Sequence, residues 1–101
     1  MDFEVIWTEP AVVDLEEILT FVAERSAHAA ETLRDSILKH VEVLGTFPSI
    51  GPIYTRDRDG GTREIVCRQY RVFYRVDEVA RRVEILTVWH GARAVPEFGS
   101  H

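Results

Sequence analysis

Two stretches in the first half of the chain repeat apolar residues with the period of an amphipathic α-helix. The apolar positions are Ala11, Leu15, Ile18 and Val22 in the first stretch, and Ala30, Leu33, Ile37, Val41 and Leu44 in the second. Thr8 and Ser26 stand where helix N-caps are expected, and we expect the first helix to run to about Glu24 and the second to end at Gly45. Two amphipathic helices with so short a break predict an antiparallel helical hairpin.

The second half of the chain changes to the alternating pattern of β-strands. Glycine and proline recur through residues 45–61, which predicts a loop. Strand-forming runs occupy residues 3–7, 62–67, 70–76 and 82–89, and tight connections join the last three. The predicted order is β-α-α-β-β-β. We therefore expect an α+β fold in which the helical hairpin packs on one face of a mainly antiparallel sheet.

The run at residues 70–76 carries the most informative side chains. Alternate residues of a strand share a face, so Val72, Tyr74 and Val76 are expected to face the helices, and Arg71, Phe73 and Arg75 the open side. Arginine beside an exposed aromatic ring is suited to holding phosphate while a base stacks. The simpler interpretation, which this strand alone favours, is that arginine keeps an exposed sheet face soluble.

Three further residues are candidates for a shared site. Arg63 begins the preceding strand and Arg93 follows the last one, so both are expected near Arg71. Arginines that repel one another are most easily held together by an anionic ligand. The alternative is that they pair with Glu64, Glu84 or Glu97. His90 is a candidate general acid or base, because histidine is the residue type most often used for that chemistry, although a histidine at a strand end is more often structural.

Composition and charge fit one small domain with an uneven surface. The 101 residues are 46% hydrophobic and carry a net charge of −5. Basic residues outnumber acidic ones only after residue 50, and Lys39 is the only lysine. This segregation predicts an acidic helical side and an arginine-rich side for anionic partners, although a GC-rich genome is an equally good explanation of the arginine preference. A lone Cys67, an acidic N-terminus and no long apolar run indicate a cytoplasmic protein without membrane contact.

The local patterns together resemble the RelE/ParE superfamily of type II toxins over about residues 3–96, with details closer to the ParE branch of plasmid-stabilisation proteins. The pieces that carry the resemblance are Val5-Ile6-Trp7-Thr8, the helix start with Ala11, Asp14, Leu15 and Ile18, then Ala29-Ala30, Leu44, Phe47, Pro48 and Gly51, Arg63-Glu64-Ile65, the strand at 70–76 and Val88-Trp89-His90-Gly91-Ala92-Arg93. We expect a single toxin domain over residues 1–98, and 99–101 resemble the remnant of an expression tag.

The resemblance implies two activities. RelE-like members cut mRNA on the ribosome without a metal, and Arg63, Arg71 and Arg93 resemble their basic residues by position. This chain departs from that pattern, because Ile65 stands where a further lysine is common and no tyrosine follows Tyr74. Only His90 is then left for proton transfer. ParE-like members instead inhibit DNA gyrase by binding, and the incomplete ribonuclease set favours this branch.

A third hypothesis is a non-toxic module that only binds an antitoxin. In each case the resemblance implies a cognate antitoxin and no cofactor or metal, and no motif for a nucleotide or a metal is found in the sequence. Phe21 and Leu38 fall partly outside the apolar stripes. We expect an antitoxin helix to cover them and an acidic extended segment to run beside the sheet, and we expect the free chain to self-associate.

Overall fold

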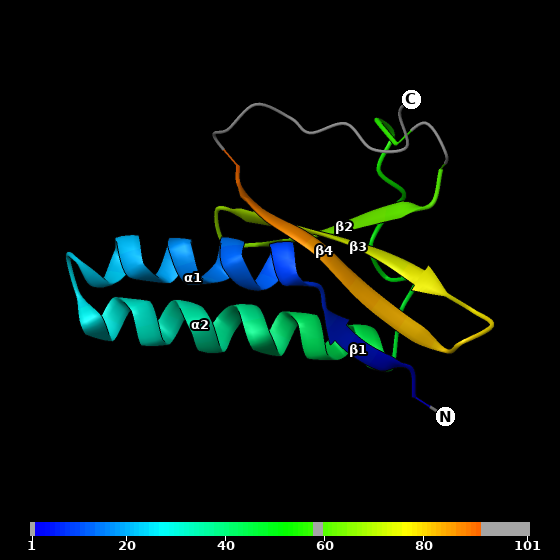
Figure 1. Cartoon of the computed structure of the whole chain (residues 1–101), viewed down its shortest axis with the longest axis horizontal. Coiled ribbons are helices and arrows are strands. Elements are labelled where there is room, and N and C mark those ends of the chain that lie inside the picture. The colour runs from blue at the N-terminus through cyan, green and yellow to red at the C-terminus, as the bar shows by residue number, and fades with distance from the viewer. Residues whose placement is uncertain (1, 58–59, 92–101) are drawn as a thin grey trace.

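A computed structural model describes residues 2–57 and 60–91 of the chain. Two helices pack on a four-stranded sheet, in the predicted order (Figure 1). The elements are β1 (Glu4–Trp7), α1 (Glu9–Ala23), α2 (Ala27–Glu42), a short 3-10 turn (Val43–Gly45), β2 (Thr62–Cys67), β3 (Tyr70–Asp77) and β4 (Arg82–His90). The α+β fold expected from the periodicity is confirmed.

The two helix starts use their capping residues differently. Ser26 accepts a hydrogen bond from the backbone N–H of Ala29 at 3.1 Å, as an N-cap serine should. Thr8 occupies the N-cap position of α1, but its hydroxyl donates to the backbone carbonyl of Ile85 at 2.7 Å. The predicted N-cap position of Thr8 is thus confirmed, but its side chain makes no capping hydrogen bond. The hydroxyl instead ties the start of α1 to β4.

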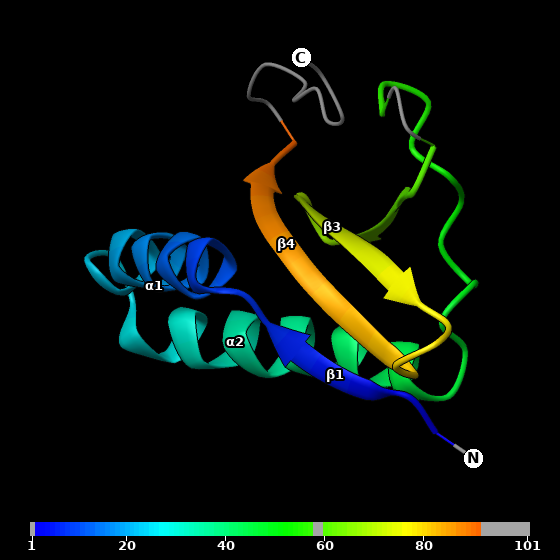
Figure 2. The same ribbon diagram turned by 45° about the vertical axis from the view of Figure 1, so that its right-hand side comes forward.

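The sheet has the strand order β1-β4-β3-β2. The last three strands form the predicted antiparallel meander, and β1 lies parallel to β4 at the edge, with Glu4 opposite Arg82 and Trp7 opposite Ile85. The turn between β2 and β3 places Arg68 in the left-handed region, at φ 58°. Both helices lie on the same side of the sheet (Figure 2).

The hydrophobic core lies between the helical hairpin and the sheet. Ile37 and Leu44 from the helical layer are fully buried there with Ile85 and other residues of the sheet. As predicted, Val72 and Tyr74 belong to this core. Such a core, with about 25 cal/mol for each Å² of apolar surface removed from water, is the main stabilising contribution in a domain of this size.

The other face of β3 is not open, which corrects the prediction for Phe73. That side chain is fully buried, because Tyr54 from the segment joining α2 to β2 packs against it edge-on, with ring centroids 4.8 Å apart. The same segment is anchored by the hydroxyl of Tyr74, which accepts from Gly51 N–H at 2.9 Å and donates to the Pro48 carbonyl at 2.8 Å. A residue far from β3 in sequence thus removes the aromatic ring from solvent.

Candidate functional site

Arg71 is held by three neighbours on the face of the sheet that lies away from the helices. Its guanidinium donates to both carboxylate oxygens of Glu64, at 2.8 and 3.1 Å, in a bidentate ion pair. It also lies 5.7 Å from the ring centroid of Tyr54 and 5.3 Å from that of Phe73. The hydrogen bond and charge of Glu64 raise the pKa of the Arg71 guanidinium. Arg71 is therefore a partly buried cation whose charge is already matched within the chain.

Arg63 does not join Arg71. In the register of β2 with β3, Arg63 stands opposite Tyr74, whereas Arg71 stands opposite Val66. Alternation along a strand then puts the side chains of Arg63 and Arg71 on opposite faces of the sheet. The Arg63 guanidinium donates to the backbone carbonyl of Gly51 at 2.7 Å. It supports the segment before β2, and the expected convergence of the two arginines on one face is not found.

His90 also lies apart from Arg71. It stands opposite Tyr70 at the end of β4, and the two rings meet edge to face with centroids 5.2 Å apart. Tyr70 belongs to the core between sheet and helices, so His90 lies on the helix side of the sheet. Arg93, the fourth predicted residue, lies outside the described residues. The three described members of the predicted site are thus divided between two faces.

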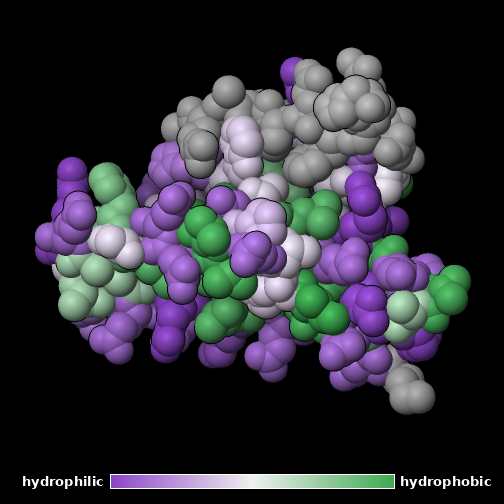
Figure 3. Space-filling model, in the orientation of Figure 1, coloured by the Kyte–Doolittle hydropathy of each residue, from purple (hydrophilic) through white to green (hydrophobic). Residues whose placement is uncertain are grey.

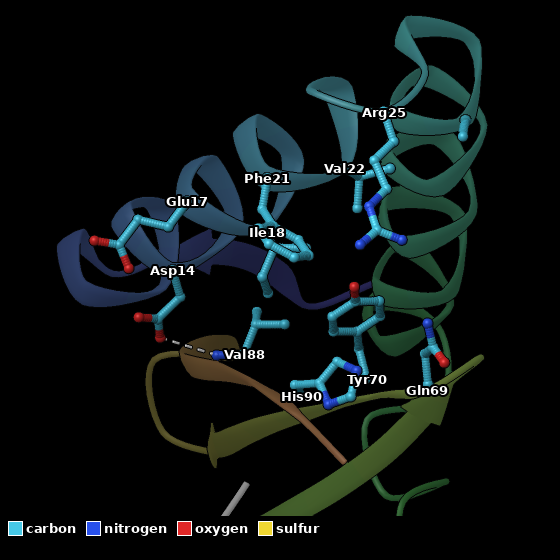
Figure 4. A pocket seen from close by; sticks show the side chains of 11 residues that line it. Asp14, Glu17, Ile18, Phe21, Val22, Arg25, Gln69, Tyr70, Val88 and His90 are labelled. Atoms are coloured by element: carbon cyan, nitrogen blue, oxygen red, sulfur yellow. Dashed lines mark hydrogen bonds between the residues drawn. The ribbon is translucent and has the colours of Figure 1, made fainter. Parts of the chain in front are cut away.

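A cleft of about 510 Å³ lies between α1 and the end of β4 (Figure 4). One wall is the apolar face of the second half of α1, with Ile18, Phe21 and Val22. The opposite wall is formed by Tyr70, Val88 and His90, and Gln69 and Arg25 close the same end. This volume lies within the range of ligand pockets in proteins.

Asp14 fixes the other end of the cleft. Its carboxylate accepts a very short hydrogen bond from the hydroxyl of Thr87 and a second from the backbone N–H of Val88, at 3.1 Å. These contacts join α1 to β4 across 73 and 74 residues of sequence. From the sequence, Asp14 is expected only on the acidic surface of the first helix and as one position of the family pattern. Its spacing within the helix gives no signal for a partner on a distant strand.

Tyr70 and Arg25 bring unused hydrogen-bond donors into the cleft. Tyr70 is only 5% exposed, and within the described part of the chain its hydroxyl has no hydrogen-bond partner. In Figure 4 this hydroxyl points across the cleft towards the guanidinium of Arg25. The Arg25 guanidinium lies 6.0 Å from the centroid of the Phe21 ring and makes no ion pair or side-chain hydrogen bond with a described residue. The sequence pattern predicts no functional role for either residue.

Cys67 and His40 form a second pair of titratable groups. Cys67 is buried with its sulfur 3.5 Å from Nδ1 of His40 and 3.4 Å from the hydroxyl of Ser36. Within residues 2–57 and 60–91, no three His, Cys, Asp or Glu side chains are placed to hold a metal ion. No helix in the same ranges is long and apolar enough to cross a membrane.

Comparison with known families decides what this fold belongs to. A sequence model described as "ParE toxin of type II toxin-antitoxin system, parDE" matches residues 5–95. The chain belongs to this family. It is thus a toxin of the ParE/RelE type from a type II toxin–antitoxin system. No curated protein matches the chain.

Solved structures of the same superfamily share the fold of this ParE-family chain. Similarity to the toxin–antitoxin complex RelBE2 from Mycobacterium tuberculosis gives a TM-score of 0.67 at 23% identity, covering 89% of this chain and 99% of that one. Similarity to the chromosomal ParDE system from P. aeruginosa gives a TM-score of 0.71 at 20% sequence identity. The match covers 87% of this chain and 95% of that one. Similarity to a mutant of the E. coli toxin RelE in the free state gives a TM-score of 0.66 at 16% sequence identity. The match covers 91% of this chain and 86% of that one.

The ParE-family chain also exposes large apolar side chains. Phe21 is 62% exposed and Leu38 39% exposed, as their positions outside the stripes predict. Phe47, Ile50 and Ile53, which the sequence analysis did not single out as exposed, are each more than half exposed. In Figure 3 green residues of the described chain lie on both sides of a pale centre, among hydrophilic residues drawn in purple.

Proposed function

We propose that this ParE-family chain arrests growth by inhibiting DNA gyrase and is held inactive by a cognate antitoxin. The observation that carries the proposal is the ion pair of Arg71 with Glu64. A ribonuclease of the RelE type needs unpaired cationic side chains to stabilise the charge that develops on the phosphate. Here the cation in that position is already matched by a carboxylate at 2.8 Å.

The positions of the other candidates support the same conclusion. Arg63 lies on the opposite face from Arg71 and bonds to the Gly51 carbonyl. His90 stacks edge-on against Tyr70 on the helix side. A general acid must come within hydrogen-bond reach of the phosphate that the cations hold. The described arrangement does not offer that, so an inhibitor that acts by binding fits these residues better than a nuclease does.

The RelE-like alternative has one observation in its favour. Arg71 lies 5.7 and 5.3 Å from the ring centroids of Tyr54 and Phe73, on the face away from the helices. A cation among aromatic rings is a combination used to hold RNA. If the Glu64 carboxylate were displaced by a phosphate of ribosome-bound mRNA, Arg71 would be available to it. This activity is therefore the second candidate.

The antitoxin partner is supported by the fold and by the exposed apolar side chains. The RelBE2 structure contains a toxin with its antitoxin, and the ParDE system is likewise a pair. Phe21 and Leu38 are exposed on the helical hairpin and offer a partner helix apolar contacts. Burying such side chains is favourable by about 1.5–3 kcal/mol each when they are fully covered. A free chain with these residues exposed is expected to self-associate.

The target is tested by expressing the chain without its antitoxin. We expect growth arrest, linearised or relaxed plasmid DNA, and inhibition of supercoiling when the purified chain is added to gyrase. The variant Arg71→Ala should keep this inhibition, because the ion pair has no part in it. Cleaved transcripts with normal supercoiling, lost in Arg71→Ala, would establish the ribonuclease instead. A chain that causes no arrest but binds the antitoxin would be the non-toxic module.

A further inference from the structure

The edge of β4 is covered by a strand over only part of its length. β1 pairs with residues 82–85 and ends at Trp7, where the chain turns into α1. Beyond this point side chains bond to the edge of β4 in place of a strand. The Thr8 hydroxyl donates to the Ile85 carbonyl, and the Asp14 carboxylate accepts from the Val88 N–H. Because the N–H and C=O of one residue point to the same edge of a strand, the Val88 carbonyl faces this edge too. The second half of β4 thus presents backbone to the cleft rather than to a strand.

The cleft beside this edge holds donors that the fold does not use. The Tyr70 hydroxyl comes from a side chain that is 95% buried, yet it lacks a partner in the described part of the chain. The hydroxyl oxygen itself keeps some exposure to the cleft, where an acceptor can reach it. The Arg25 guanidinium lies at the same end (Figure 4) and makes no ion pair with any described residue. Together they form a donor pair suited to a carboxylate.

The rest of the cleft favours an apolar body attached to that carboxylate. Ile18, Phe21 and Val22 form one wall and Val88 lies opposite, so an aliphatic or aromatic side chain would be enclosed by carbon on two sides. Asp14 and Glu17 line the far end. The site is therefore polarised, with cation and hydroxyl at one end, carbon in the middle and carboxylates at the other.

We propose that this cleft binds an extended segment of the antitoxin, with one acidic side chain on Tyr70 and Arg25 and a neighbouring apolar side chain against Phe21. The inference rests on the proposed antitoxin partner and names the part of this chain that recognises it. A peptide fits better than a small acid because the cleft is bounded by a strand edge, where an extended backbone gains hydrogen bonds as well as side-chain contacts. The polar ends also fix the direction of the segment.

The test measures binding of the antitoxin encoded beside this gene to the full chain and its variants by titration calorimetry. Tyr70→Phe removes one oxygen that makes no internal hydrogen bond, so the fold is kept. We expect it to weaken binding about tenfold, Arg25→Ala by tenfold to a hundredfold, and Phe21→Ala by about tenfold. Arg34→Ala, on the exposed side of α2, is the matched control and should bind as the unchanged chain does.

The outcomes separate this inference from the proposed function. If the unchanged chain forms no complex, the antitoxin partner itself is wrong. If the complex forms and the Tyr70→Phe and Arg25→Ala variants bind the antitoxin with unchanged affinity, the antitoxin is a partner but does not bind in this cleft. Octanoate serves as a probe for a free organic acid. Saturable octanoate binding that Arg25→Ala abolishes, with antitoxin affinity unaffected, would assign the cleft to a small ligand and overturn the proposal.

Discussion

Arg71 and Glu64 form a bidentate ion pair, with 2.8 Å between the Arg71 Nη2 and a Glu64 carboxylate oxygen, as the alternative interpretation of the sequence predicts. Their side chains are only 24% and 19% exposed. Phe73 and Tyr54 lie beside the guanidinium and limit the water that reaches it. Partial burial makes such a pair more persistent than an exposed one, since less solvent competes for the charges. The pair decides what this face of the sheet can bind.

Glu64→Gln should turn this face into an anion site. The substitution keeps the shape of the side chain and removes the charge that neutralises Arg71. We expect binding of a short single-stranded RNA, measured by fluorescence anisotropy at low salt, to strengthen about threefold to tenfold. Glu78→Gln, which makes the same change of net charge in an exposed turn, is the control. Equal gains in the two variants would mean that only net charge matters, and Arg71→Ala added to Glu64→Gln should cancel the gain.

Asp14→Ala should destabilise the fold through the link between α1 and β4. The Asp14 carboxylate accepts hydrogen bonds from Thr87 and from the Val88 N–H. Hydrogen bonds to a charged group contribute about 1.5–3 kcal/mol each, so losing both should lower the free energy of unfolding by about 3–6 kcal/mol. Urea denaturation measures the loss. Glu16→Ala, an exposed acid on the same helix, should change stability by less than about 0.5 kcal/mol; a similar loss in both would show that the link is not responsible.

Gly51→Ala tests how closely the segment before β2 approaches the sheet. A Cβ at this position would lie 2.7 Å from the hydroxyl of Tyr74 and would clash with the backbone carbonyl oxygen of Glu64. Overpacking of this kind costs about 1–3 kcal/mol, and here it also displaces the hydrogen bonds of the segment. Thermal unfolding should show a clear loss. Gly61→Ala, whose Cβ would be 3.4 Å from a flexible Arg75 side chain, should be nearly neutral. Indistinguishable melting temperatures would contradict the close approach.

Tyr74 should make stability depend on alkaline pH. Burial raises the pKa of its hydroxyl, since the charged form is disfavoured away from water. The unfolded chain ionises this group near the ordinary value of about 10, before the folded chain does. The contribution of Tyr74 is therefore complete below about pH 10 and is lost as pH rises through the higher folded value. Tyr74→Phe should be less stable at pH 7, because Gly51 N–H and the Pro48 carbonyl lose their partner.

The same variant provides the readout for this prediction. Urea midpoints of the unchanged chain and Tyr74→Phe, measured between pH 7 and pH 11, should approach each other as pH rises. Parallel curves would show that the hydroxyl does not titrate differently in the two states. Tyr70→Phe is the control, because the Tyr70 hydroxyl makes no hydrogen bond with the described residues.

The amino-acid sequence by itself determined the elements, their order and the fold family. Helical and strand periodicities are local properties, set by which residues need burial, and they place both helices and all four strands correctly to within one or two residues at most ends. The cap at Ser26 and the exposure of Phe21 also follow from local spacing. Alternation in β3 correctly predicts that Val72 and Tyr74 face the core.

Only the tertiary structure decided which side chains meet. The burial of Phe73 depends on Tyr54, which is distant in sequence, and the faces of Arg63 and Arg71 depend on the register between β2 and β3. The cleft with Tyr70 and Arg25 exists because β1 ends before β4 does. Register, strand length and loop placement are set by the packing of the whole chain, and a one-residue change in pairing reverses every side chain of a strand. For that physical reason the local sequence pattern predicts the fold but not which side chains meet at the site.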